Sequence, residues 1–185
     1  EFQKSNSVRE DLDAYKFGSH SAYSLESIKI EETNTCVEWH LTYDYSRPIG
    51  GGGYTSRSEG KRLMLTEVGQ ESCIDNTKIP PYKFFYKGLN NGSYYLPNRL
   101  TKAIDHWGFY NDKEGNNFSD ELNIPETNQA LFGNKGYLNH GKSDRNTDPE
   151  WVDVGIMEKI IYPTGGVSEF VFEPNSFSGT ETVVD

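Results

Sequence analysis

The clearest pattern along the chain is a strict alternation of apolar and polar residues between Cys36 and Tyr45. A period of two places successive side chains on opposite faces of a strand, so we predict a strand with one apolar and one polar face. The apolar positions of this strand are Val37, Trp39, Leu41, Tyr43 and Tyr45. Residues 23–30 are also β-like, and we expect the two segments to form a hairpin that turns at residues 31–35.

A second hairpin is predicted near the end of the sequence, from residues 156–162 and 167–173. Its turn contains Pro163, Gly165 and Gly166, and we expect Gly165 to need a positive φ angle. Both faces of this hairpin carry apolar residues, so we expect it to be covered on both sides. Residues 62–68 and 81–86 predict two further strands of the same antiparallel kind.

Short helical turns are predicted at two places. Leu100, Ile104 and Trp107 are spaced by four and three residues, which is compatible with one or two helical turns within residues 99–110. In the second place, Asp148 can act as an N-cap, because a proline suited to the first helical position follows it.

The remaining segments predict loops. Residues 50–53 are four consecutive glycines, and residues 90–92 read Asn-Asn-Gly, which is typical of a turn. Residues 111–148 are rich in Asn, Asp and Gly and form a predicted loop-rich insertion. Residues 1–21 are polar and aperiodic, so we expect an extended or poorly ordered leading segment before an antiparallel β module over residues 22–185.

Composition supports a mainly β fold made of antiparallel hairpins and ribbons. Val, Ile, Thr, Tyr, Phe and Trp together number 56, whereas Ala, Leu and Met number 17 in a chain of 185 residues. β-Branched and aromatic side chains suit a pleated surface, whereas helix bundles rely on Ala and Leu. The formal net charge of −10 disfavours nucleic-acid binding, because neutralising phosphates needs a basic face. No run of about 20 apolar residues could form a transmembrane helix, so no membrane insertion is expected.

Candidate chemistry is sparse. The histidines (His20, His40, His106 and His140) lack zinc-site spacing, and the GxSxG motif of a serine nucleophile is absent. The alternating sets Asp112, Glu114, Asn116 and Asp144, Asn146, Asp148 lack the Gly and Glu that a calcium-binding EF-hand needs. We therefore predict no metal, no cofactor and no catalytic residues, with a hydrolase fragment as the least favoured alternative. Cys36 and Cys73 could form a disulfide in an oxidising compartment, but their spacing does not decide this.

One aromatic cluster suggests a binding role. Residues 105–110 bring together an acid, an imidazole and several aromatic rings that could stack on a sugar: Asp105, His106, Trp107, Phe109 and Tyr110. Adjacent residues point in different directions on a strand or helix, so a catalytic pair among them is disfavoured. A carbohydrate- or ligand-binding β module is therefore the chief alternative to a purely structural role.

Two segments are distinctive: residues 105–111, Asp-His-Trp-Gly-Phe-Tyr-Asn, and residues 160–166, Ile-Ile-Tyr-Pro-Thr-Gly-Gly. Residues 80–86, 96–100, 144–151 and 169–173 add to them. In this order the segments resemble the region that precedes the YD-repeat array in RHS-type bacterial cell-surface proteins, which are similar to teneurins. The similarity spans roughly residues 25–174, while residues 1–20 and 116–141 do not contribute to it.

This resemblance implies a non-enzymatic piece of β scaffold in a secreted or cell-surface protein of a Gram-negative bacterium. Its expected partners are neighbouring β-repeat segments of the same polypeptide, which would stack with it into a shell, with a glycan or surface partner as the alternative. The resemblance supplies no catalytic residues, and it places the secretion signal outside the sequence considered.

Overall fold

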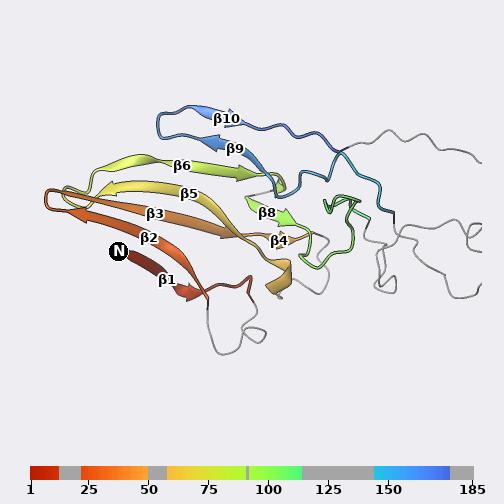
Figure 1. The fold of residues 1–185 in the computed structure, drawn as a ribbon, viewed down its shortest axis with the longest axis horizontal. Helices are drawn as coiled ribbons and strands as arrows, with labels where there is room; N and C mark the ends of the chain where they lie inside the picture. Colours follow the sequence, from red (N-terminus) through yellow and green to blue (C-terminus); the bar gives the residue numbers. More distant parts are fainter. Residues whose placement is uncertain (13–21, 50–57, 91, 114–143, 176–185) are drawn as a thin grey trace, which may run out of the picture. The chain divides into compact units, whose positions relative to one another are not determined.

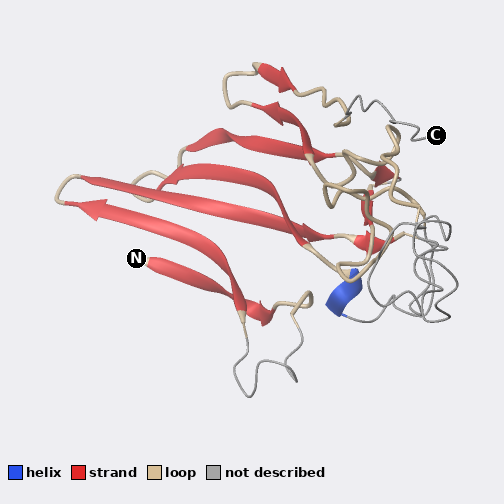
Figure 2. Ribbon diagram, turned by 45° about the vertical axis from the view of Figure 1, so that its right-hand side comes forward, coloured by secondary structure: helices blue, strands red, loops and turns tan. Residues whose placement is uncertain are grey.

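The computed structural model describes residues 1–12, 22–49, 58–90, 92–113 and 144–175. Its chain divides into two units, which are described separately. The first comprises Glu1–Leu100 and Val154–Val171, and the second comprises Thr101–Asp153 and Phe172–Asp185. The protein is mainly β, as predicted: about half of the described residues lie in strands, and helix is almost absent from them (Figure 2).

The first unit is built on a seven-stranded antiparallel sheet with the order β1-β2-β3-β5-β6-β9-β10 (Figure 1). Its strands are β1 (Phe2–Val8), β2 (Tyr23–Glu32), β3 (Thr35–Tyr45), β5 (Leu63–Ser72), β6 (Lys78–Tyr86), β9 (Met157–Ile161) and β10 (Val167–Glu169). The β2–β3 and β9–β10 hairpins and the strands predicted over residues 62–68 and 81–86 are confirmed. Strand β1, which pairs with β2, was not indicated by its polar sequence. Residues 13–21 of the predicted leading segment lie outside the described residues.

Strand register separates the sheet into two chemically different faces, because directly paired residues point to the same side. On one side Ile28 pairs with Trp39, Leu41 with Val68, Val68 with Tyr82, and Phe84 with Ile160. We call this side the apolar face. The opposite side, the charged face, carries Lys29, Glu38, His40, Glu67, Glu71, Lys78, Lys83, Lys159 and Glu169.

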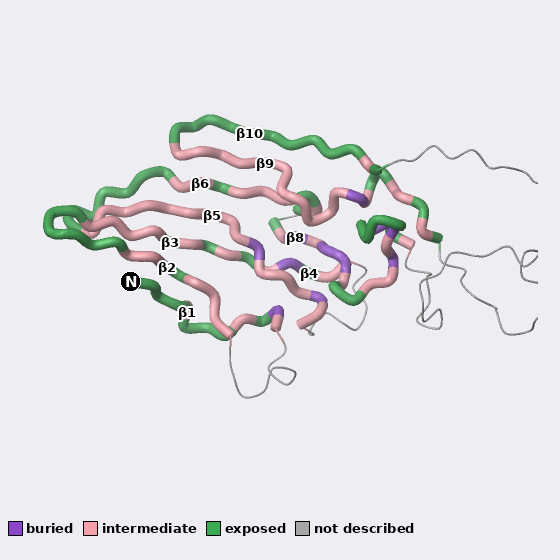
Figure 3. Tube along the Cα trace, in the orientation of Figure 1, coloured by how far each residue is buried: buried purple, intermediate pink, exposed green. Residues whose placement is uncertain are grey.

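The described strands make extensive contacts only with the strands hydrogen bonded beside them, so no second layer of described strands packs on the apolar face. Most of the sheet is accordingly half-buried (Figure 3). The cluster of buried apolar residues is small and consists of Met64, Tyr94 and Leu96. It lies where the large sheet meets a small one made of β4 (Arg47–Pro48), β8 (Ser93–Leu96) and β7 (Leu89–Asn90).

A disulfide joins Cys36 of β3 to Cys73, the residue after β5, with their Cα atoms 5.2 Å apart. The backbone N–H of Cys73 also donates to the carbonyl of Cys36 at 3.1 Å. The pairing that spacing left open is therefore present, and it ties the two strands together at one end of the sheet.

The β9–β10 turn has the predicted geometry. Gly165 adopts φ +85°, and its N–H donates to the carbonyl of Tyr162 at 2.9 Å. The expectation that this hairpin is covered on both sides is wrong for its second strand, because Val167 on one face and Phe170 on the other are both exposed. Val167 is 51% exposed, and Val171, just beyond β10, is 92% exposed.

Of the two predicted helical turns, one is present. The N–H groups of Trp151 and Val152 donate to the carbonyl of Asp148, and the carboxylate of Asp148 accepts from the N–H of Glu150 at 3.0 Å. The helical turns predicted within residues 99–110 are absent, and an isolated bridge joins Ile104 to Tyr110 instead.

The structure adds a 3-10 helix, η1 (Ser58–Gly60), that the sequence did not suggest. Among the described residues no helix has the length and hydrophobicity to cross a membrane. Residues 50–53 and 114–143, which hold the predicted glycine loop and most of the loop-rich insertion, lie outside the described part of the chain.

Candidate functional site

The predicted aromatic cluster lies in the second unit, on a tight turn organised by Asp105. The Asp105 side chain is fully buried, and its Oδ1 accepts hydrogen bonds from the backbone N–H groups of Trp107 at 2.8 Å and Phe109 at 2.9 Å. Its Oδ2 accepts from the hydroxyl of Thr147 at 3.0 Å. The carboxylate therefore stabilises its own loop, which explains why this segment turns back instead of forming a helix.

The aromatic residues of this turn divide between surface and interior. Trp107 is 42% exposed and Phe109 is 37% exposed, while the imidazole of His106 meets the Trp107 ring edge-on at a centroid distance of 6.4 Å. Tyr110 is buried instead, packed edge-on against Trp151 with ring centroids 5.7 Å apart. The exposed rings that remain for a ligand are those of His106, Trp107 and Phe109.

Two polar residues outside the predicted cluster, Asn111 and Arg145, fix this turn to a distant segment. Asn111 is fully buried, and its side-chain amide donates to the carbonyls of Asp144 at 2.9 Å and Asn146 at 3.0 Å. Arg145 donates to the carbonyl of Asp105 at 2.7 Å. Both residues fall in segments that carry the family resemblance, but their spacing alone gave no signal of a shared role.

Two of the acidic residues considered as calcium ligands accept hydrogen bonds from their own loops instead. The carboxylates of Asp144 and Asp148 accept backbone N–H groups two residues further along, from Asn146 and Glu150. No group of three His, Cys, Asp or Glu side chains among the described residues could hold a metal ion. Glu114 and Asn116 lie outside the residues that the structure describes.

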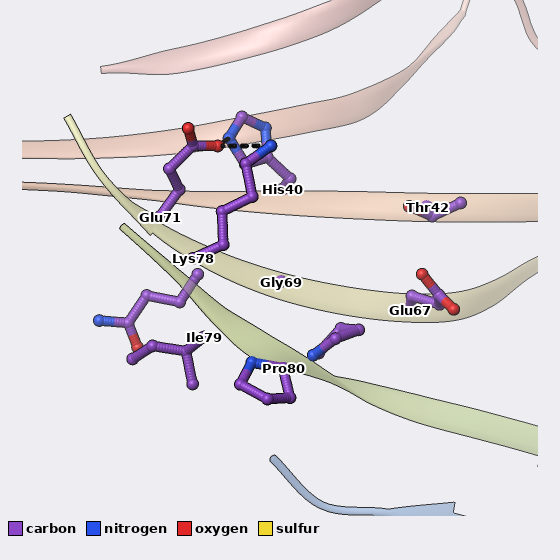
Figure 4. A pocket seen from close by; sticks show the side chains of 10 residues that line it. His40, Thr42, Glu67, Gly69, Glu71, Lys78, Ile79 and Pro80 are labelled. Carbon is purple, nitrogen blue, oxygen red and sulfur yellow. Dashed lines mark ion pairs between the residues drawn. The ribbon is translucent and has the colours of Figure 1, made fainter. Parts of the chain in front are cut away.

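A hollow of about 540 Å³ opens on the charged face of the sheet, over β3, β5 and β6 (Figure 4). Gly69 has no side chain to fill the space opposite His40, and the register shifts where Pro80 and Pro81 enter β6. Glu71 lies 3.5 Å from the imidazole Nε2 of His40 and 3.3 Å from the Nζ of Lys78. This site was missed because none of its residues forms a local sequence motif.

The chemistry that the hollow can perform is limited by the positions of its carboxylates. Glu67 and Glu71 are four residues apart on one strand, so their Cα atoms are about 13 Å apart. Glu67 is paired with Lys83 at 3.3 Å, whereas Glu71 is paired with His40 and Lys78. Each carboxylate therefore has its own cationic partners, and the two are held at separate positions along β5.

Comparison with known proteins identifies no relative: no family model, no curated protein and no solved structure matches this chain.

Proposed function

We propose that this chain is a non-enzymatic structural module of a larger RHS- or YD-repeat-like protein, in which neighbouring β-ribbons of the same polypeptide extend its sheet. The proposal builds on the sequence resemblance and on one structural observation, the open edge formed by β10 and the two residues after it.

The β10 edge is apolar, exposed and unpaired among the described strands. Val167 and Val171 are exposed, and Phe170, which continues the pairing with β9 through a 2.8 Å hydrogen bond to Glu158, is also exposed. No described strand lies beyond β10. Exposed apolar edges favour aggregation, and natural proteins usually pair or cover them. A neighbouring ribbon would pair with β10 and cover its exposed apolar residues.

The same proposal includes export from the cell. Disulfides such as Cys36–Cys73 persist mainly in oxidising environments, including the periplasm and the cell surface. The location would therefore be extracellular or on the cell surface, in agreement with the family resemblance.

Hydrogen exchange can test the edge in the longer polypeptide that the proposal requires. The N–H of Val171 should exchange quickly in the isolated chain and slowly when the following ribbons are present. The N–H of Phe170, which is already bonded to Glu158, serves as the matched control and should be protected in both. Equally fast exchange of Val171 in both proteins would show that no ribbon pairs there.

A second candidate function, carbohydrate binding, is favoured by the half-exposed rings of Trp107 and Phe109 beside His106. Flat aromatic faces of this kind can stack on sugar rings. Glycan-array binding that is lost in Trp107→Ala, with the circular dichroism spectrum unchanged, would support this function. Glycan binding that survives in Trp107→Ala would contradict this function. So would the absence of glycan binding by the native chain.

A further inference from the structure

The apolar face of the sheet presents a broad surface on the side away from the ion pairs. Positions on this face along β3, β5 and β6, all fully described strands, include no charged residue around Trp39, Leu41, Val68, Tyr82 and Phe84. The opposite face carries the ion pairs of Glu67 with Lys83 and Glu71 with Lys78. Charge depletion with aromatic enrichment is typical of the centre of a protein interface.

Sheets of this kind are normally found in pairs. A sheet with one apolar face buries that face against another layer, and two sheets pack about 10 Å apart with interdigitating side chains. Among the described strands that second layer is missing, as the contacts between strands show. A partner that supplies it has to present a face of similar apolar character.

The size of the face fits a stable dimer. The seven strands contain 55 residues. With a rise of about 3.3 Å per residue and a strand spacing of about 4.8 Å, they cover a footprint of about 870 Å². Stable protein–protein interfaces bury about 800 Å² on each partner.

From these observations we infer that two copies of this chain pack through their apolar faces to form a two-layered β-sandwich around a two-fold axis. The centre of the face, over β3, β5 and β6, carries no charge, so two copies can meet there without placing like charges in contact. The charged faces then point outward on both sides of the dimer, where their ion pairs stay in contact with water. This contact uses a different surface from the β10 edge, so either proposal can fail without the other.

Adjacent residues of β3 provide a matched pair of variants. Leu41→Glu introduces a carboxylate on the apolar face, and Thr42→Glu introduces the same group on the charged face. In sedimentation equilibrium, the native chain and Thr42→Glu should dimerise with similar dissociation constants. Leu41→Glu should raise the dissociation constant at least tenfold. A native chain that stays monomeric up to hundreds of micromolar, or equal effects of the two variants, would overturn the inference.

Hydroxyl-radical footprinting of the native chain tests the same contact without a variant, in case Leu41→Glu fails to fold. Between dilute and concentrated protein, oxidation of Trp39 and Tyr82 should fall severalfold, while His40 on the charged face should be oxidised equally. Unchanged oxidation of Trp39 across the dimerisation range would place the contact elsewhere. A dimer lost in Val171→Lys and retained in Leu41→Glu would assign it to the β10 edge instead.

Discussion

At the scale of single residues, the buried carboxylate of Asp105 organises the whole turn that carries the aromatic cluster. It accepts two backbone N–H groups and one hydroxyl, from Trp107, Phe109 and Thr147. We expect Asp105→Ala to lower the free energy of unfolding by about 2–3 kcal/mol, because buried donors lose their acceptor. Asp105→Asn retains an acceptor oxygen and should cost less. Equal unfolding curves for Asp105→Ala and the native chain in urea would contradict this role.

Gly165 and Gly166 stand side by side in the β9–β10 turn but have different backbone requirements. Gly165 has φ +85°, whereas a Cβ on Gly166 would meet its nearest atoms at 3.8 Å, an ordinary contact. Gly165→Ala should lower the free energy of unfolding by about 1–2 kcal/mol, because L-residues are strained at positive φ. Gly166→Ala is the matched control and should change stability little. Thermal unfolding of the two variants measures the difference, and equal melting temperatures would refute the assignment.

The Arg9–Asp11 pair predicts a pH dependence of stability. Burial alone would raise the pKa of Asp11, but the two hydrogen bonds from Arg9, at 2.7 and 3.0 Å, and the charge of that residue outweigh it. The pKa of Asp11 is therefore lowered in the folded state. The stabilisation is present above the unfolded-state pKa of about 3.9 and is lost as the pH falls through the folded-state value.

Arg9→Gln makes this contribution measurable. The variant should be less stable than the native chain by about 1–3 kcal/mol at pH 7, because the buried carboxylate keeps its charge without its partner. The difference should shrink as the pH falls from about 4 through the lowered folded-state pKa of Asp11, where the carboxylate of the native chain becomes protonated. Free energies of unfolding from urea titrations at a series of pH values provide the measurement. A difference that stays constant down to pH 2 would show that Asp11 does not carry it.

At the scale of secondary-structure elements, the sequence predicted strands correctly where apolar and polar side chains alternate, as they do in a half-buried sheet. The alternation of Val37, Trp39 and Leu41 located β3 because one side of that strand faces apolar neighbours across the sheet. Strand β1 was missed because an edge strand with mostly exposed residues has no such alternation. Backbone pairing with β2 forms it instead.

The wrong helical prediction has a different physical cause. Leu100, Ile104 and Trp107 have helical spacing, but the carboxylate of Asp105 competes for the backbone N–H groups that a helix would use. The contacts by which Asn111 and Arg145 join this turn to residues 144–146 could not be predicted either. Their partners are backbone groups more than 30 residues away in the sequence.

The disulfide between β3 and the end of β5 should contribute measurably to the free energy of unfolding. Cys36 and Cys73 close a loop with a sequence separation of 37. Replacing both residues by serine should lower the free energy of unfolding by about 2–4 kcal/mol, since the unfolded chain is no longer constrained. Reducing agent should destabilise the native chain by a similar amount and leave the double variant unchanged. Insensitivity of the native chain to reducing agent in urea titrations would contradict this contribution.

At the scale of the whole molecule, the main feature is the segregation of apolar and charged residues onto opposite faces of the sheet, because the buried core is small. The described buried apolar residues are few, and those of the sheet unit gather around Met64, Tyr94 and Leu96. The larger apolar area is the face of the sheet on which no other described strand packs. Stability of the chain should therefore depend on whatever covers that face, which links folding to association.

This linkage predicts a melting temperature that depends on protein concentration. If the folded dimer dissociates on unfolding, each tenfold rise in concentration stabilises it by about 1.4 kcal/mol of dimer. The melting temperature of the native chain and of Thr42→Glu should thus rise from micromolar to hundreds of micromolar protein. Leu41→Glu should melt at one temperature throughout, because its apolar face no longer pairs. A native melting temperature independent of concentration would mean that the sheet is stable as a single layer and that its apolar face has another purpose.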